Sequence, residues 1–343
     1  MDALRGNFKD TLNLFRKATP KRVYNAAKVL SSYQYSRLSG KASHWALPTA
    51  ISIEPTTSCN LRCPECPSGL RSFTRPTGML QPDLFKKVID ELAPSLSYLT
   101  FYFQGEPYLH PQFLELVQYA SNKNIYTATS TNAHFLNDAA ARKTIESGLD
   151  RLIISIDGTT QETYEAYRVG GKLDKVIEGA KNIVRWKQEL KSLTPFVVFQ
   201  FLVVKPNEHQ VESVHQLARE IGVDHVALKT AQIYDYKHGS DLIPTLDKYS
   251  RYQKNSDNTY SIKNELASHC WKMWQSCVIT WDGKVVPCCF DKDAHYVMGD
   301  LQIQSFKEIW SSKKYQNFRS SLLRSRNEIE MCKNCTEGTK VWA

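Results

Sequence analysis

Between residue 51 and about residue 230, short apolar runs alternate with longer amphipathic segments. The apolar runs predict six strands, at residues 50–54, 98–103, 125–130, 151–156, 195–204 and 225–229. The segments between them predict helices near residues 82–93, 111–123, 137–147, 173–191 and 208–221, with Gly148 and Gly222 suited to end two of them. This alternation is typical of βα units built around a parallel sheet.

Six βα units form either a doubly wound open sheet or a partial barrel, and the periodicity alone is compatible with both. In either architecture the chemistry belongs at the carboxyl ends of the strands. Polar clusters follow four of the predicted strands in turn, at residues 59–66, 104–107, 131–132 and 157–158. Because they recur at the same end of successive strands, we expect them to share one pocket.

The two ends of the chain have other patterns. Residues 1–48 show helix-like spacing of apolar positions such as Leu12, Phe15, Val23 and Leu30, which predicts an N-terminal helical extension. The βα region would then occupy residues 49–232. Residues 233–268 are polar and weakly periodic, as in a linker, and a cysteine-rich module follows at 269–343.

Composition and charge exclude several classes of protein. With 42% hydrophobic and 23% charged residues among 343, the chain is expected to fold around a sizeable core. No segment reaches the roughly 18 apolar residues of a membrane span, and the first residues lack a secretory signal, so we expect a cytoplasmic protein. Much of the net charge of +9 lies in residues 1–50, where nine basic and two acidic residues give 9 − 2 = +7.

This basic segment has three interpretations: a solvated helical face, a peripheral contact with acidic lipid, or a contact with an acidic partner. No motif for nucleic-acid binding accompanies it, so we expect no nucleic-acid partner.

The chain has nine cysteines, and their distribution points to metal rather than disulfides. Three of them lie within residues 59–66, and the other six all follow residue 269. Cys59, Cys63 and Cys66 form a Cys-x3-Cys-x2-Cys loop directly after the first predicted strand. Three thiolates this close can hold three corners of an iron-sulfur cube and leave one iron open. A structural zinc site would need a fourth ligand, and the nearest histidines in the sequence are His44 and His110.

This loop resembles the signature of the radical S-adenosylmethionine (SAM) superfamily, whose core is a partial (β/α)6 barrel. The resemblance implies a catalytic 4Fe-4S cluster whose open iron chelates the amino and carboxylate groups of SAM. Reductive cleavage of SAM would then give a 5′-deoxyadenosyl radical that abstracts a substrate hydrogen. It also implies a flavodoxin- or ferredoxin-type reductant.

Further positions are assigned by the same resemblance. The Gln104-Gly105-Glu106-Pro107 segment resembles the family's Gly-Gly-Glu-Pro motif with Gln in place of the first Gly, and Glu106 would pair with the methionyl ammonium. The other implied SAM-binding residues are Ser130, Asn132, Ser155, Asp157 and Arg168. Each position is equally compatible with an ordinary turn or capping role.

The C-terminal cysteines predict a second metal site. Asp282-Gly283 separates two alternating runs as in a hairpin, and a Cys-x2-Cys pair ends the module. The region resembles the SPASM or shorter twitch extension of the superfamily. This resemblance implies one auxiliary 4Fe-4S cluster on Cys270, Cys288, Cys332 and Cys335. Cys277 and Cys289 would be leftover thiols, and a zinc ribbon on the same four ligands is the alternative.

The enzymes that the chain resembles either oxidise a sugar-like substrate or modify a peptide, with the auxiliary cluster as electron acceptor. A short, single-cluster module without a recognisable peptide-clasping winged-helix domain favours an oxidoreductase that acts on a small or carbohydrate-like substrate. Two alternatives stay open: a peptide-modifying maturase of the same superfamily, and a non-catalytic iron-sulfur or zinc module. The sequence assigns no general acid or base, although Glu54, Tyr102 and Lys229 are candidates for the barrel interior.

Overall fold

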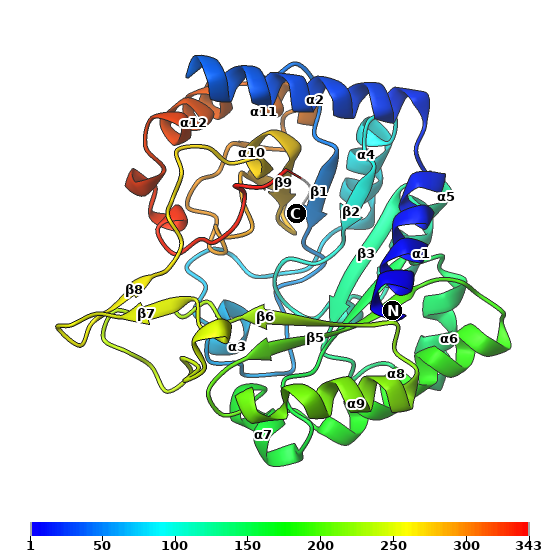
Figure 1. Ribbon diagram of the computed structural model, residues 1–343. Coiled ribbons are helices and arrows are strands. Elements are labelled where there is room, and N and C mark those ends of the chain that lie inside the picture. The colour runs from blue at the N-terminus through cyan, green and yellow to red at the C-terminus, as the bar shows by residue number, and fades with distance from the viewer. Residues whose placement is uncertain (1, 342–343) are drawn as a thin grey trace.

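The computed structural model describes residues 2–341, and side chains from residue 8 onward. Its main sheet has nine strands in the order β11-β10-β9-β1-β2-β3-β4-β5-β6, so that β6 ends the sheet on one side (Figure 1). The strands of the predicted βα region are β1 (Ala50–Ile53), β2 (Tyr98–Thr100), β3 (Tyr126–Thr131), β4 (Arg151–Ser155), β5 (Phe196–Val203) and β6 (His225–Thr230). All adjacent pairs among these six are parallel, which confirms the predicted α/β fold with a partial barrel.

Helices cover the outer face of this curved sheet (Figure 1). They are α4 (Pro82–Leu92), α5 (Phe113–Asn122), α6 (Asp138–Glu146), α7 (Gln161–Tyr167), α8 (Leu173–Glu189) and α9 (Val211–Ile221). Helix α3 (Pro67–Leu70) instead belongs to the cysteine loop, and its residues Ser68 and Gly69 line the pocket that the cysteines share. The short helices α3 and α7, and the 3-10 turns η1 (Pro107–Leu109) and η2 (Glu208–Gln210), were not among the predicted elements. Gly222 ends α9 in the left-handed conformation, with φ of 89°, as its position predicted.

The strands alternate between the two faces of the sheet. Ile51, Leu99, Leu152 and Phe199 point outward into the main apolar core against the helices. The intervening positions, such as Ser130 and Ser155, point inward, and the two hydroxyl oxygens of this pair lie 3.5 Å apart. Because side chains on a strand alternate faces, the polar positions of different strands meet inside the barrel.

The hairpin predicted at Asp282-Gly283 is present, and it extends the barrel sheet. Strands β9 (Ser276–Ile279) and β10 (Lys284–Val286) are antiparallel, and β11 (Gly299–Asp300) pairs with β10. The sequence pattern did not predict that β9 lies parallel to β1, with Ile51 opposite Cys277. The C-terminal module is therefore joined to the barrel by a continuous hydrogen-bonded ladder.

The remaining elements complete the C-terminal half. Helices α10 (Lys272–Gln275), α11 (Phe306–Trp310) and α12 (Lys313–Arg324) are followed by the turns η4 (Arg326–Glu328) and η5 (Glu330–Cys332). In the predicted linker, the turn η3 (Asp247–Tyr249) precedes a small hairpin of β7 (Tyr252–Lys254) and β8 (Tyr260–Ile262).

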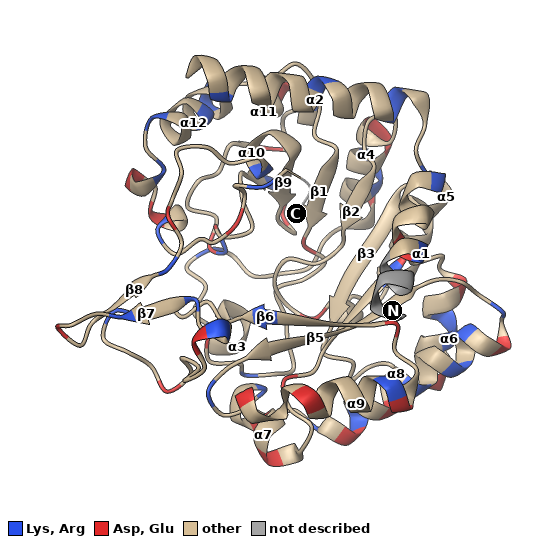
Figure 2. Ribbon diagram, viewed as in Figure 1, with Lys and Arg blue, Asp and Glu red and all other residues tan. Residues whose placement is uncertain are grey.

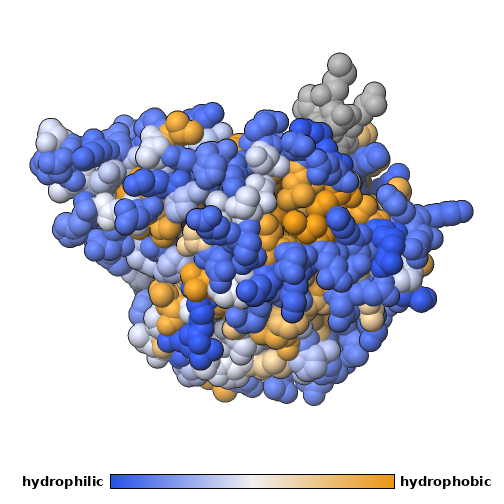
Figure 3. Space-filling model, turned by 90° about the horizontal axis from the view of Figure 1, so that it is seen from below, coloured by the Kyte–Doolittle hydropathy of each residue, from blue (hydrophilic) through white to orange (hydrophobic). Residues whose placement is uncertain are grey.

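The N-terminal residues form two helices, α1 (Asp2–Arg16) and α2 (Pro20–Ser39). Helix α2 packs on the C-terminal module, where Val29 and Tyr33 join Trp271 and Trp274 in a second apolar core. Figure 2 shows basic residues along α2, whereas α8 and α9 carry both signs of charge. Viewed from below, the surface is mainly hydrophilic, with a large group of apolar side chains near the middle of this face and smaller groups beside it (Figure 3). No helix within residues 2–341 is long and apolar enough to cross a membrane.

Candidate active site and auxiliary cluster site

The three cysteines of the first motif lie in one pocket of about 130 Å³ at the carboxyl ends of the strands. Five of the six predicted SAM-binding residues line the same pocket: Glu106, Ser130, Asn132, Ser155 and Arg168. Its lining also includes Ser68, Tyr102 and Thr131, which the motif comparison did not assign. The structure thus brings together side chains that are more than 100 residues apart in the sequence.

The cysteine loop is held against its neighbours by backbone contacts that leave no room for side chains. Gly105 has φ of +73°, and a Cβ there would lie 2.2 Å from the carbonyl oxygen of Thr56. A Cβ on Gly69 would lie 2.6 Å from the backbone nitrogen of Cys63. Glycine is therefore required at both positions for the loop to close on the second strand.

Gln104 occupies the position where the family has glycine, and its side chain contacts the cysteine loop. Its Oε1 lies 3.8 Å from the Sγ of Cys66, so the extra side chain points at the motif. The glycine that the backbone needs is the next one, Gly105, whose amide donates to the Ser68 hydroxyl at 2.9 Å. Glu106, the next residue, is held by its amide, which donates to the Ser58 carbonyl at 2.8 Å.

The donor set around the sulfurs fits an iron-sulfur cluster. The Leu61 amide donates to Cys59 Sγ at 3.4 Å, and Asn132 Nδ2 lies 3.9 Å from the same sulfur. Arg168 Nη1 lies 3.7 Å from Cys63 Sγ. N–H groups directed at thiolate sulfur stabilise its negative charge and tune a bound cluster. Burial raises the pKa of Cys59 to about 11, so the thiol stays protonated at neutral pH until iron displaces the proton.

Asp157 differs from the other predicted SAM-binding residues because it does not line the pocket. It is fully buried, accepts the Arg168 Nε–H at 2.5 Å and accepts the Leu202 amide at 2.7 Å. Both carboxylate oxygens are occupied by the protein. In this arrangement Asp157 positions Arg168, and Arg168 carries the positive charge into the pocket.

Glu106 is buried among donors that fix its orientation. It accepts hydrogen bonds from the Thr131 hydroxyl at 2.7 Å and from the Asn132 amide at 2.8 Å. Burial nevertheless raises the pKa of Glu106 to about 7, because removing the carboxylate from water disfavours its charged form more than the hydrogen bonds favour it. A cation that binds beside this carboxyl would lower its pKa and favour the ionised form.

The raised pKa of Glu106 predicts that SAM binding depends on pH. A carboxyl with a pKa near 7 is increasingly protonated as the pH falls through that value, and only the ionised form attracts a cationic nitrogen. We expect the affinity of the reconstituted protein for SAM to rise by up to about tenfold in total between about pH 6 and pH 8, because the ionised fraction of a carboxyl with a pKa near 7 rises about tenfold over that range. Equilibrium dialysis at several pH values measures this profile. The Glu106→Gln variant should bind more weakly with a flatter profile, and an unchanged slope in that variant would contradict the assignment.

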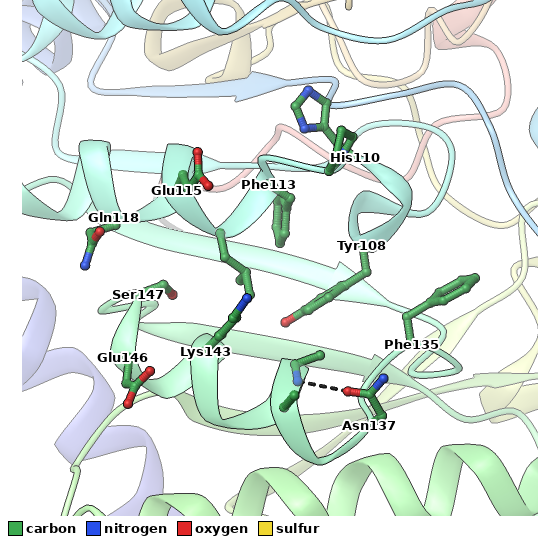
Figure 4. Close-up of a pocket in the computed structure, with 14 residues that line it drawn as sticks. Tyr108, His110, Phe113, Glu115, Gln118, Phe135, Asn137, Lys143, Glu146 and Ser147 are labelled. Atoms are coloured by element: carbon green, nitrogen blue, oxygen red, sulfur yellow. Dashed lines mark hydrogen bonds between the residues drawn. The ribbon is translucent and has the colours of Figure 1, made fainter.

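A larger cavity, of about 500 Å³, lies away from the cysteines between η1, α5 and α6 (Figure 4). It is lined by residues such as Tyr108, Phe113 and Lys143, and by none of the predicted site residues. The Tyr108 hydroxyl is hydrogen bonded to Thr144 at 2.8 Å, and Asn137 caps α6. These two contacts hold η1 and α6 in place, and the cavity shares no lining residue with the cysteine pocket.

The C-terminal cysteines gather around a buried arginine. Cys270, Cys332 and Cys335 are buried, and the Nη2 of Arg326 donates to Cys335 Sγ at 3.1 Å. Arg326 is 1% exposed, and its other partners are the carbonyls of Glu337 and His269 at 2.7 and 3.4 Å. No ion pair between Arg326 and a carboxylate occurs among the described residues. A buried guanidinium is stabilised by nearby negative charge. The N–H groups of Arg326 would therefore suit cysteines that are present as thiolates and hold an iron-sulfur cluster.

The two remaining cysteines have different surroundings. Cys277 lies in β9 within the main apolar core, as expected of a buried thiol. Cys289 is exposed, and a hydrogen bond from Cys288 together with nearby Lys272 lowers its pKa to about 6, while the same contact raises the pKa of Cys288. The choice of Cys288 as fourth ligand stays a prediction. Within residues 2–341, no three His, Cys, Asp or Glu side chains are grouped to hold a single metal ion.

Comparisons with known proteins agree with both sites. Residues 53–218 match the model of the radical SAM superfamily, and residues 270–336 match the SPASM iron-sulfur cluster-binding domain. The chain belongs to the radical SAM superfamily and carries a SPASM domain. The first domain implies a 4Fe-4S cluster and SAM, and the second implies auxiliary iron-sulfur clusters.

Two curated relatives align with this chain over most of their own length. The tungsten-containing aldehyde ferredoxin oxidoreductase cofactor-modifying protein of Pyrococcus furiosus is 26% identical over 295 residues, covering 78% of this chain and 82% of the relative. The AdoMet-dependent heme synthase of Methanosarcina barkeri is 26% identical over 333 residues, covering 86% and 90%. Among solved structures, Streptococcus suis SuiB bound to precursor peptide SuiA has a TM-score of 0.63 at 12% identity, covering 92% and 80%. This last likeness concerns the fold alone.

Proposed function

We propose that the protein is a radical SAM oxidoreductase that oxidises a small or carbohydrate-like molecule and passes the second electron to an auxiliary 4Fe-4S cluster. When bound, the catalytic cluster and SAM supply a 5′-deoxyadenosyl radical that removes one hydrogen atom from the substrate. Loss of one further electron and one proton would complete an oxidation of an alcohol to a carbonyl. A flavodoxin- or ferredoxin-type protein would supply the electron that starts each turnover.

The observation that supports this proposal is that side chains of the C-terminal module lie close to the catalytic pocket. Tyr102 lines the catalytic pocket and lies within electrostatic reach of Cys289 and Lys272 from the C-terminal module. Lys292 of that module lies near both Cys66 and Cys289, and its Nζ is 3.0 Å from the Tyr234 hydroxyl. A substrate held between the two sites would be close to a hydrogen abstractor and to an electron acceptor.

The names of two relatives support a small substrate. The relatives from Pyrococcus and Methanosarcina have names that refer to a cofactor and to haem, which are small molecules. The PqqA peptide cyclase of Rhodopseudomonas palustris, 30% identical over 215 residues, is named for a peptide, so peptide modification stays the second candidate function.

Removal of the auxiliary cysteines should separate SAM cleavage from substrate oxidation. After anaerobic reconstitution, we expect wild type to bind about eight irons and the Cys332→Ala/Cys335→Ala variant about four, because each cube holds four. The variant should still form 5′-deoxyadenosine from SAM but should oxidise no substrate. Cys288→Ala and Cys289→Ala form a matched pair, of which only the first is expected to lower the iron content.

The substrate class is tested by deuterium transfer. Perdeuterated sugars and polyols are incubated with the reconstituted protein, and 5′-deoxyadenosine is analysed by mass spectrometry for deuterium. Incorporation from these compounds supports the proposal, whereas incorporation only from a deuterated peptide library would establish peptide modification instead. If wild type cleaves no SAM, the protein is a non-catalytic metal-binding module.

A further inference from the structure

Helix α1 is attached to the barrel through its polar side chains. Asp10 is 6% exposed, accepts a hydrogen bond from the Tyr126 hydroxyl and forms an ion pair with Arg151. Asn13 donates to Asp150 Oδ1 at 2.8 Å, and Lys17 Nζ contacts Asp150 Oδ2 at 2.5 Å. These contacts lie at the amino ends of β3 and β4, on the side of the barrel opposite the cysteine pocket.

The apolar side chains of α1 point the other way. Phe8 is 67% exposed, Leu12 39% and Phe15 68%. At about 3.6 residues per turn, positions 8, 12 and 15 share one face, and positions 10, 13 and 17 share the opposite one. An amphipathic helix on a globular protein ordinarily buries its apolar face. Here the orientation is reversed, and the α1 stripe (Phe8, Leu12 and Phe15) is presented to solvent.

The charge around the α1 stripe indicates what covers it. Lys9, Arg16 and Lys21 are exposed on or next to α1, within a segment whose net charge is 9 − 2 = +7 over residues 1–50. The acidic side chain of α1 that faces the barrel, Asp10, is neutralised by Arg151. Basic residues beside an apolar helical stripe are the features that bind a helix into the interface of an anionic bilayer.

We propose that the α1 stripe docks on an anionic lipid surface, with α1 in the plane of the interface and Phe8 and Phe15 inserted at the headgroup level. A second copy of the chain is a poorer occupant, because it would bring two segments of like charge together. A protein partner would ordinarily bury about 800 Å² on each side, more than three side chains offer. The helix lies outside both matched segments, 53–218 and 270–336, so this role is independent of the radical chemistry.

Vesicle flotation of the full-length protein tests the proposal. We expect wild type to float with phosphatidylcholine vesicles that contain phosphatidylglycerol and to remain unbound with phosphatidylcholine alone. Binding should weaken as salt is added, since the charged contribution is screened. The Phe8→Ser/Phe15→Ser variant should lose roughly tenfold or more in apparent affinity. Lys9→Glu/Arg16→Glu should lose binding to the anionic vesicles without loss of fold, which circular dichroism monitors.

A matched control removes apolar side chains elsewhere on the surface. Leu193 and Ile303 are 79% and 82% exposed, and Leu193→Ser/Ile303→Ser should leave vesicle binding unchanged. The proposal is overturned if wild type does not float with anionic vesicles, or if the control loses as much binding as the α1 variants. It is equally overturned if light scattering shows a dimer of wild type that Phe8→Ser/Phe15→Ser dissociates, because the stripe would then be covered by a second copy.

Discussion

Replacement of Cys63 by alanine is expected to abolish SAM cleavage, with formation of 5′-deoxyadenosine falling below detection. Cys63 is the most buried of the three motif cysteines, at 5% exposure, and its sulfur is the one that Arg168 approaches. Two thiolates are too few to hold a cube that already leaves one iron for SAM. The measurement is chromatography of 5′-deoxyadenosine after anaerobic reconstitution and reduction with dithionite, and the bound iron should fall to about four, the auxiliary complement.

The control for this substitution is Cys277→Ala, which removes a buried thiol of the same chain. Cys277 is 2% exposed in β9 and lies in the apolar core opposite Ile51. Its replacement deletes one sulfur from a packed core and should cost about 1 kcal/mol of stability, while iron content and SAM cleavage stay at the wild-type level. If Cys63→Ala retained SAM cleavage, or if both variants lost it equally, the motif would not be the site of the catalytic cluster.

The sequence predicted those features that are encoded locally. All six strands of the βα region begin within one residue of their predicted starts, because each combines an apolar run with flanking turn residues. The cysteine spacing located the pocket, and the family resemblance named Ser130 and Ser155, both of which line it. Such features depend on neighbours a few residues away, and periodicity reports them directly.

Features that depend on long-range contacts were not predicted. The parallel pairing of β9 with β1 joins residues that are more than 200 positions apart, and no local pattern encodes it. The role of Asp157 was not predicted either, since its carboxylate is occupied by Arg168 and by the amide of Leu202, which lies three elements later in β5. Tertiary contacts of this kind decide whether a polar residue after a strand faces a ligand or supports a neighbour.

Arg326 is the most informative of the residues that the sequence did not single out. In the apo protein the surrounding thiols are expected to be protonated, because burial raises the pKa of Cys332 to about 11 and raises that of Cys270. The guanidinium is then a buried charge with only carbonyl and thiol partners. Once iron holds the cysteines as thiolates, the same guanidinium gains anions at hydrogen-bonding distance, of which Cys335 Sγ is the nearest at 3.1 Å.

We therefore expect Arg326→Met to destabilise the reconstituted protein more than the apo protein. Loss of the charged hydrogen bonds should cost the reconstituted form about 2–3 kcal/mol, whereas in the apo form the removal of an unpaired buried charge offsets part of that loss. Anaerobic urea unfolding of both forms measures the difference. A purely structural arginine would lower both stabilities equally, and that result would contradict the assignment.

The same substitution should lower the reduction potential of the auxiliary cluster, since a positive charge and an N–H···S bond favour the reduced, more negative form. Potentiometric titration followed by electron paramagnetic resonance resolves the two clusters, and the catalytic one should be unchanged because Arg326 contacts none of Cys59, Cys63 and Cys66. Arg326→Lys keeps the charge and should restore part of the potential, although a single ammonium cannot reproduce three directed contacts. A potential that is identical in wild type and Arg326→Met would show that the cysteines around Arg326 do not hold the electron acceptor.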